Sequence, residues 1–170
     1  MDLIVDCSRK GVRLGNASCE LLEPEAKGDE LHKLLDRFLF ENNLELEQIK
    51  RVLTTLGPGS FTGIRAGIAF CEGLCFSGKR TLHGVTTLRA LATNLPHGTD
   101  SLDFPKNGEI VLHARANFYY AGNAEGETLK QFEKPPQTHE NLSIVPFAKL
   151  IDFIPPSNIQ KANYLMNPYS

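Results

Sequence analysis

The sequence has no hydrophobic run long enough to cross a membrane. A bilayer-spanning helix needs roughly 18 apolar residues, and no stretch approaches that length. The N-terminus also lacks a basic region followed by an apolar core, which is the pattern of a secretion signal. We therefore expect a cytoplasmic protein with no membrane partner.

The chain also has almost no net charge. Its 18 basic and 20 acidic residues give a formal charge of -2, which provides no general attraction for polyanions. Contact with nucleic acid would need a local basic patch or a basic partner subunit. The net charge indicates neither of these.

Little in the sequence suggests a metal site. The cysteines form no Cys-x-x-Cys pair, and the histidines show neither metal-ligand spacing nor a local pairing with a nucleophile. Buried structural cysteine is several times more common than cysteine in such a site, so we predict no metal ligand. These residues are Cys7, Cys19, Cys71 and Cys75, with His32, His83, His97, His113 and His139.

The stretch 57–69, with the sequence GPGSFTGIRAGIA, is the most distinctive part of the chain. It follows the apolar run 52–56, and an apolar run followed by a glycine turn and helical periodicity predicts strand, turn and helix. Pro58 and its flanking glycines suit a sharp turn, and the hydroxyl of either Ser60 or Thr62 can cap the helix.

This turn lacks the signatures of a catalytic loop. A phosphate loop requires lysine and a hydroxyl residue after its second glycine, whereas Gly63 is followed by Ile64 and Arg65. The nucleophile motif Gly-x-Ser-x-Gly is also absent around Ser60. A helix N-terminus can hold an anion through its backbone donors, but this signal is weak and a structural role is favoured.

Small residues recur along the predicted helix, at Gly59, Gly63 and Gly67. Glycine inside a helix costs about 1 kcal/mol relative to alanine, so a compensating contact is expected. A row without side chains permits close approach of another backbone. The approaching partner could equally be this chain's own core or the surface of another chain.

Local patterns predict the remaining elements. The polar stretch 97–107, which contains glycine and proline, is the expected boundary between a lobe of residues 1–96 and a smaller lobe of residues 97–170. The predicted strands are 3–6, 12–14, 52–56, 81–85, 109–115, 118–122 and one from 126 toward 132. Residues 17–22 could continue the second strand or form a third, with a hairpin turn at 15–16 between them. The predicted helices are 29–41, a turn at 44–49, 62–77, one that Thr86 or Thr87 can cap and that closes at 94–96, and a short one at 147–151.

The motif 57–69 and the later Gly84-Val85-Thr86-Thr87-Leu88 closely resemble the TsaB, or YeaZ, family of the bacterial threonylcarbamoyladenosine system. The likeness extends to Asp6-Cys7-Ser8, where the family tends to have Asp-Thr-Ser. It also includes His113-Ala114-Arg115 before a pair of tyrosines, where the family tends to have Asp-Ala-Arg. Roughly the first three quarters of the chain share this resemblance.

The resemblance implies an actin-like α/β fold of the sugar-kinase and Hsp70 ATPase type, a mixed sheet with flanking helices and here a reduced second lobe. It further implies a non-catalytic subunit that supports TsaD, which carries the active site, and works with the ATPase TsaE. Together they transfer a threonylcarbamoyl group to the adenosine beside a tRNA anticodon. ATP and magnesium are then expected on the partner subunits, and tRNA would be met only through the complex.

The same resemblance assigns the helix after the glycine turn to the interface with TsaD, or with a second copy when TsaD is missing. The predicted interface residues are Gly59, Ser60, Phe61, Thr62, Gly63, Arg65, Ala66, Gly67 and Phe70. A vestigial nucleotide site is expected at Asp6 and Ser8, with no catalytic residue. An actin-like ATPase needs several carboxylates and a second phosphate loop, and the sequence shows only Asp6 at the end of a strand.

Two other classes of function stay open at this point. One is an independent enzyme, either a small actin-fold kinase or a protease-like relic with Ser60 or Cys7 as nucleophile. The other is a homodimeric interaction protein without a tRNA role. A base within hydrogen-bond reach of either nucleophile would favour the enzyme.

Overall fold

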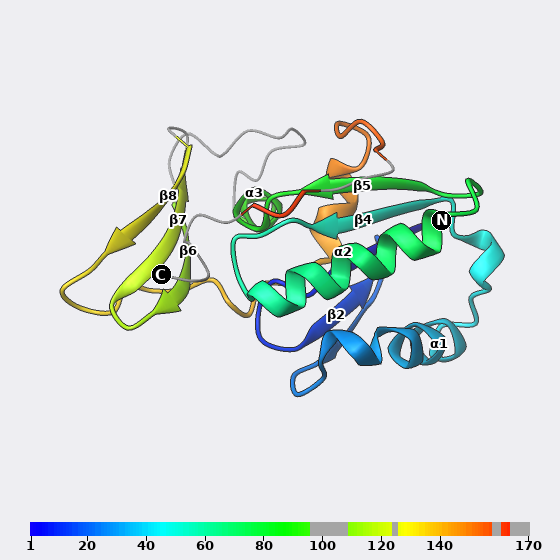
Figure 1. Ribbon diagram of the computed structural model, residues 1–170, viewed down its shortest axis with the longest axis horizontal. Coiled ribbons are helices and arrows are strands. Elements are labelled where there is room, and N and C mark those ends of the chain that lie inside the picture. The colour runs from blue at the N-terminus through cyan, green and yellow to red at the C-terminus, as the bar shows by residue number, and fades with distance from the viewer. Residues whose placement is uncertain (96–108, 124–125, 158–160, 164–170) are drawn as a thin grey trace.

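The computed structural model describes residues 1–95, 109–123, 126–157 and 161–163. Within these ranges the chain forms a mixed α/β structure with a five-stranded sheet and a separate three-stranded sheet (Figure 1). The predicted boundary at 97–107 lies outside the described residues. No helix in the described part of the chain is long and apolar enough to span a membrane.

The five-stranded sheet has the order β3-β2-β1-β4-β5. The first three strands are antiparallel neighbours, whereas β4 and β5 run parallel to β1, as a strand, helix, strand sequence requires. The predicted strands are thus confirmed, and of the two alternatives for residues 17–22 the structure has the separate third strand. Their bounds are β1 Asp2–Asp6, β2 Val12–Gly15, β3 Glu20–Glu23, β4 Arg51–Thr55 and β5 Thr81–Val85.

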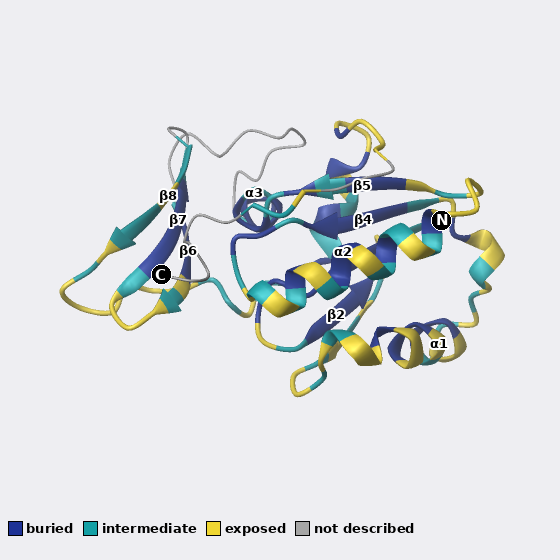
Figure 2. Cartoon of the chain, viewed as in Figure 1, coloured by how far each residue is buried: buried dark blue, intermediate teal, exposed yellow. Residues whose placement is uncertain are grey.

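Two helices cover one face of this sheet (Figure 1). They are α1 Leu31–Glu41, which follows a 3-10 turn η1 at Gly28–Glu30, and α2 Phe61–Cys75. Leu3 and Val5 of β1 point toward them and join the same apolar cluster. Figure 2 shows the buried inner sides of both helices and their exposed outer sides. A further 3-10 turn, η2 Leu46–Gln48, precedes β4 and confirms the short turn predicted there.

The opposite face of the sheet is covered by elements from later in the chain. Successive side chains of a strand point to opposite faces, so Ile4 and Leu53 point away from α1 and α2. They pack in one cluster with α3 Thr87–Ala92 and the 3-10 helix η3 Val145–Leu150. Apolar residues of the three-stranded sheet belong to this cluster too. The two predicted lobes therefore share a core, and their division into 1–96 and 97–170 stays a prediction.

The three-stranded sheet is an antiparallel meander, β6-β7-β8. Its strands are β6 Ile110–Arg115, β7 Phe118–Asn123 and β8 Gly126–Gln131, which confirms the predicted hairpin and third strand. Ala116 has a φ of 49° in the turn between β6 and β7. The predicted short helix at 147–151 is present as η3.

Candidate functional site

The glycine turn connects β4 to α2 by passing over the end of β1. Gly57 and Gly59 have φ angles of 96° and 152°, which side chains rarely allow. Ser60 N donates a hydrogen bond of 2.6 Å to Ser8 O, so the turn is tied to the residues after β1. Of the two predicted caps, Ser60 is the one used: its Oγ accepts from Gly63 N at 3.2 Å.

The glycine row faces this chain's own first strand. A Cβ atom at Gly59 would lie 2.0 Å from Ser8 O, and one at Gly63 would lie 2.1 Å from Cys7 O. At Gly67, which is buried, it would lie 3.4 Å from both Cβ and Sγ of Cys7. The close approach that these three glycines permit is made by residues 7 and 8 of this chain, and their place in a partner interface stays a prediction.

The remaining predicted interface residues lie at or near the surface of α2. Ser60, Thr62 and Arg65 are exposed, and the Arg65 guanidinium stacks over the half-buried Phe61 ring at 5.3 Å. Ala66 and Phe70 are half-buried. The turn η1 covers Ala66, because a Cβ atom added to Gly28 of η1 would lie 2.2 Å from the Ala66 Cβ.

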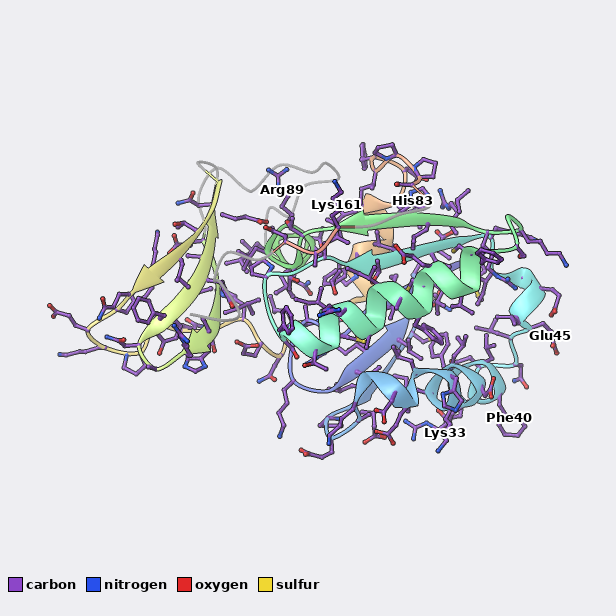
Figure 3. The ribbon with its side chains drawn as sticks, in the orientation of Figure 1. Lys33, Phe40, Glu45, His83, Arg89 and Lys161 are labelled. Carbon is purple, nitrogen blue, oxygen red and sulfur yellow. The ribbon has the colours of Figure 1, made fainter. Side chains whose placement is uncertain are left out.

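Sequence reasoning missed the far half of this surface. Three more exposed residues continue the line of Thr62 and Arg65 along α2, and we call the five together the outer face of α2: Thr62, Arg65, Ala69, Gly73 and Phe76. Their spacing of three and four positions was the available signal. The Phe76 side chain is 93% exposed, and an added Cβ at Gly73 would meet no atom within 4 Å. By comparison, Phe40 and Lys33 point outward from α1 (Figure 3).

Asp6, the predicted nucleotide-site carboxylate, is completely buried at the end of β1. Its Oδ1 accepts hydrogen bonds from Ser8 N at 2.9 Å, Ser8 Oγ at 2.5 Å and Thr55 Oγ1 at 2.8 Å. Its Oδ2 accepts from Arg9 Nε at 2.8 Å and lies 2.6 Å from Arg9 Nη2. The structure thus brings Asp6 and Ser8 together and adds buried Arg9, which the sequence pattern did not indicate, while a vestigial nucleotide site here stays a prediction.

The Asp6 carboxylate is strongly held in its charged form. Burial by itself would raise the pKa of Asp6, but Arg9, the hydrogen bonds from Ser8 and the more distant Arg13 together lower it to about 2. Arg13 is also buried, and burial together with repulsion from Arg9 lowers the pKa of its guanidinium. Two arginines and one aspartate therefore share the interior at this point.

These residues do not fit a magnesium nucleotide site. Magnesium prefers an octahedral shell of oxygen ligands, including one or two carboxylates. Both oxygens of Asp6 are already engaged, and a buried guanidinium occupies the side on which a cation would bind. Within the described ranges, no group of three or more His, Cys, Asp or Glu residues could hold a metal ion.

The two candidate nucleophiles have no activating base among the described residues. Burial raises the pKa of the Cys7 thiol far above its usual range, and the negative charge of Asp6 raises it further. The Ser60 hydroxyl accepts the capping hydrogen bond from Gly63 and contacts no described histidine or carboxylate by a hydrogen bond. The described residues therefore do not supply the geometry that a protease-like site at Ser60 or Cys7 would need.

A cavity of about 450 Å³ lies between the glycine turn and the three-stranded sheet, and Ser8, Ser60 and Tyr120 line it together with His113. His113 stands where the resembling family tends to have an acidic residue. Its Nε2 lies 3.1 Å from Ala116 O, and its ring packs edge-on against Tyr119 with centroids 5.2 Å apart. The His113 side chain is therefore held by contacts within the hairpin of β6 and β7.

A second cavity, of about 620 Å³, lies at the ends of β4 and β5. Glu127 of β8 reaches into it and accepts hydrogen bonds from Thr86 Oγ1 and from Asn163 Nδ2. Burial raises the pKa of Glu127, and these hydrogen bonds and the charge of Arg89 oppose that rise. Thr86, one of the two predicted capping residues, is the N-cap of α3, but its hydroxyl bonds to Glu127 and not to the helix.

Comparison with known proteins agrees with this fold. The model of the family described as TsaD, tRNA N6-adenosine threonylcarbamoyltransferase, matches residues 26–165. A solved structure from Pseudomonas aeruginosa, of an uncharacterized protein with similarity to peptidase YEAZ, superposes with a TM-score of 0.58 at 22% identity. It covers 80% of this chain and 68% of that chain. The predicted actin-like α/β fold is thereby confirmed, and the chain belongs to the TsaD family.

Two of the curated relatives that match part of the chain are TsaB proteins. The tRNA threonylcarbamoyladenosine biosynthesis protein TsaB of Haemophilus influenzae is 28% identical over 97 residues, which are 57% of this chain and 39% of that protein. TsaB of Escherichia coli K12 is 32% identical over 77 residues, which are 45% of this chain and 33% of that protein. The chain is a TsaB-like, or YeaZ-like, protein, and it matches between a third and two fifths of the length of these relatives.

Proposed function

We propose that this chain is a non-catalytic subunit in the biosynthesis of threonylcarbamoyladenosine on tRNA, the process named for its TsaB relatives. The observation that carries the non-catalytic part is the state of Asp6. The carboxylate that an actin-like ATPase would use for magnesium is paired with Arg9 in the interior. The independent kinase is disfavoured for the same reason.

The proposed partner is a TsaD-like catalytic subunit, and the outer face of α2 is the proposed contact. Exposed Phe76 offers apolar area, while Ala69 and Gly73 allow a second helix to approach closely. Arg65 supplies a charge at the other end of this face. A TsaE-like ATPase and tRNA would join through the complex, with ATP and magnesium on the partner subunits.

A homodimer without a tRNA role is the second candidate. The same outer face supports it, because small residues along one helix suit the antiparallel or parallel approach of an identical helix. The two candidates differ in what they predict for a mixture with a TsaD-like protein. Under the main proposal the heteromeric contact displaces the homodimer, and under the alternative the homodimer persists.

Ala69→Arg tests the proposed surface. Ala69 is exposed, so the substitution should leave the melting temperature within about 2 °C of the parent. A long cation placed in the middle of a close helix contact should weaken association at least roughly tenfold. Affinity for a TsaD-like protein is measured by isothermal titration calorimetry, and self-association by analytical ultracentrifugation.

The matched control is Ala17→Arg, which places the same charge at an exposed site in the turn between β2 and β3. It should keep the parent affinity. If Ala69→Arg and Ala17→Arg bind the TsaD-like protein equally well, the outer face of α2 is not the contact. If the parent binds no TsaD-like protein but dimerises, the homodimer alternative replaces the main proposal.

A further inference from the structure

Arg9 joins two parts of the chain that are far apart in sequence. Its side chain is buried, with 4% of the residue exposed. On one side Nε and Nη2 contact Asp6 of β1, and on the other Nη1 donates to Glu140 O at 2.9 Å and to Leu142 O at 2.6 Å. These carbonyls lie 131 and 133 residues further along the chain.

Arg13 strengthens this connection from the neighbouring strand. Its Nη2 donates to Glu140 O at 3.2 Å and its Nη1 to Lys10 O at 3.1 Å. Glu140 O therefore accepts from both buried guanidinium groups. A planar guanidinium is suited to such a role, because it directs several donors along fixed directions at once.

The segment held by these bonds is part of the later elements of the fold. Glu140 also accepts, through Oε1, a hydrogen bond of 2.8 Å from His113 N in β6. Leu142 packs against the core cluster that includes η3. The contacts of Arg9 thus extend from the end of β1 to the three-stranded sheet and to η3.

We propose that Arg9 is a built-in cation that fills the cation position beside Asp6 and fastens residues 140–142 to β1, in place of a metal ion and its ligand. In an actin-like ATPase, magnesium and nucleotide would bind a carboxylate such as Asp6. Here the positive charge, the donors and the bridging contacts all belong to the chain. The inference concerns the isolated chain and does not depend on the partner proposed above.

Electrostatics exclude a divalent ion as long as Arg9 is in place. The ion would have to displace Arg9 Nε, which lies 2.8 Å from Asp6 Oδ2, or bind within a few ångströms of the Arg9 guanidinium, and the charge of buried Arg13 adds to the repulsion. Like charges at such distances in a buried site repel strongly, and neither arginine can lose its proton near neutral pH. Removing Arg9 frees Asp6 Oδ2, while the Ser8 and Thr55 hydroxyls stay on Oδ1 of the same carboxylate, so the site then offers several oxygen ligands.

The test uses Mn²⁺ as a probe, titrated calorimetrically into the purified chain with and without ATP. The parent should show no saturable Mn²⁺ site. Arg9→Ala should gain a site that binds Mn²⁺ at least about tenfold more tightly than the parent does, and adding Asp6→Asn to Arg9→Ala should remove this site. Lys10→Ala, at an exposed neighbour of Arg9, should behave as the parent. A saturable Mn²⁺ site in the parent that is lost in Asp6→Asn would overturn the proposal.

Arg9→Lys keeps the charge and covers the case in which Arg9→Ala does not fold. A lysine ammonium cannot reach Asp6 and both carbonyls with the geometry of a guanidinium. Hydrogen exchange of the amides at 139–145 should therefore become at least about tenfold faster than in the parent, with no gain of Mn²⁺ binding. Exchange unchanged from the parent and from Lys10→Ala would contradict the fastening role.

Discussion

At the scale of single residues, Asp6 carries the clearest consequence for stability. Its pKa is lowered from 3.8 to about 2, so its ionised form stabilises the fold above about pH 4, and this contribution is lost as the pH falls toward 2. A shift of this size corresponds to about 2 kcal/mol at neutral pH. Urea unfolding at about pH 6 and about pH 2.5 measures the difference.

Asp6→Asn is the variant that isolates this contribution. It cannot ionise, so its free energy of unfolding should fall less than that of the parent between the two pH values, although it starts lower because Arg9 loses its counter-charge. Glu25→Gln removes an exposed carboxylate whose pKa Lys10 lowers through a solvent-screened contact, so it should change the pH dependence far less than Asp6→Asn does. Equal pH dependence in Asp6→Asn and the parent would show that Asp6 is not the group responsible.

The sequence revealed the position of Asp6 but not its state. An apolar run ending in Asp-Cys-Ser predicts a carboxylate at the end of a strand, and the structure has it there. An ion pair between Asp6 and Arg9 could also be suspected, because the two residues lie only three positions apart in the sequence. The hydrogen bonds from Arg9 to the carbonyls of Glu140 and Leu142 could not be predicted, because contacts across 131 and 133 residues depend on the packing of the whole chain.

At the scale of elements, α2 separates two kinds of glycine. Gly63→Ala would place a Cβ against the Cys7 carbonyl oxygen at 2.1 Å, a backbone atom that cannot easily move. We expect a loss of about 1 to 3 kcal/mol in the free energy of unfolding. Gly73→Ala meets no atom within 4 Å and should gain roughly 0.5 to 1 kcal/mol from helix propensity.

Urea unfolding of the two variants, made in the same helix with the same added methyl group, measures this contrast directly. Two losses of similar size would mean that Gly73 is covered in the folded protein and that the outer face of α2 is not free. Two gains would mean that Gly63 does not lie against β1. Either result would require a different orientation of α2.

The spacing of the glycines was enough to predict close packing along α2, but not the side on which it occurs. Small residues lie on both sides of this helix, with Gly63 and Gly67 toward Cys7 and Ala69 and Gly73 toward the solvent. Periodicity alone cannot distinguish two small-residue faces on one helix. The structure distinguishes them, because Ile64, next to Gly63, is buried in the core, whereas Ala69 and Gly73 are exposed.

At the scale of the whole molecule, local patterns predicted nearly all of the described strands and helices, while the packing of later elements onto the first sheet was not predicted. Ile144 and Phe147, at the start of η3, are fully buried against the face of the sheet opposite α1 and α2. A proline-rich stretch gives little periodicity from which to infer such a contact. The chain therefore closes its second face with elements that the sequence described only as a small lobe.

The most direct test of the proposed function is reconstituted tRNA threonylcarbamoylation with TsaD-like and TsaE-like proteins, ATP, magnesium and the acyl donor. The chain alone should neither hydrolyse ATP nor modify tRNA. Modification by the mixture should require the chain, fall at least about tenfold with Ala69→Arg, and persist with Ala17→Arg. Full modification without the chain, or ATP hydrolysis by the isolated chain that Asp6→Asn abolishes, would contradict a non-catalytic supporting subunit.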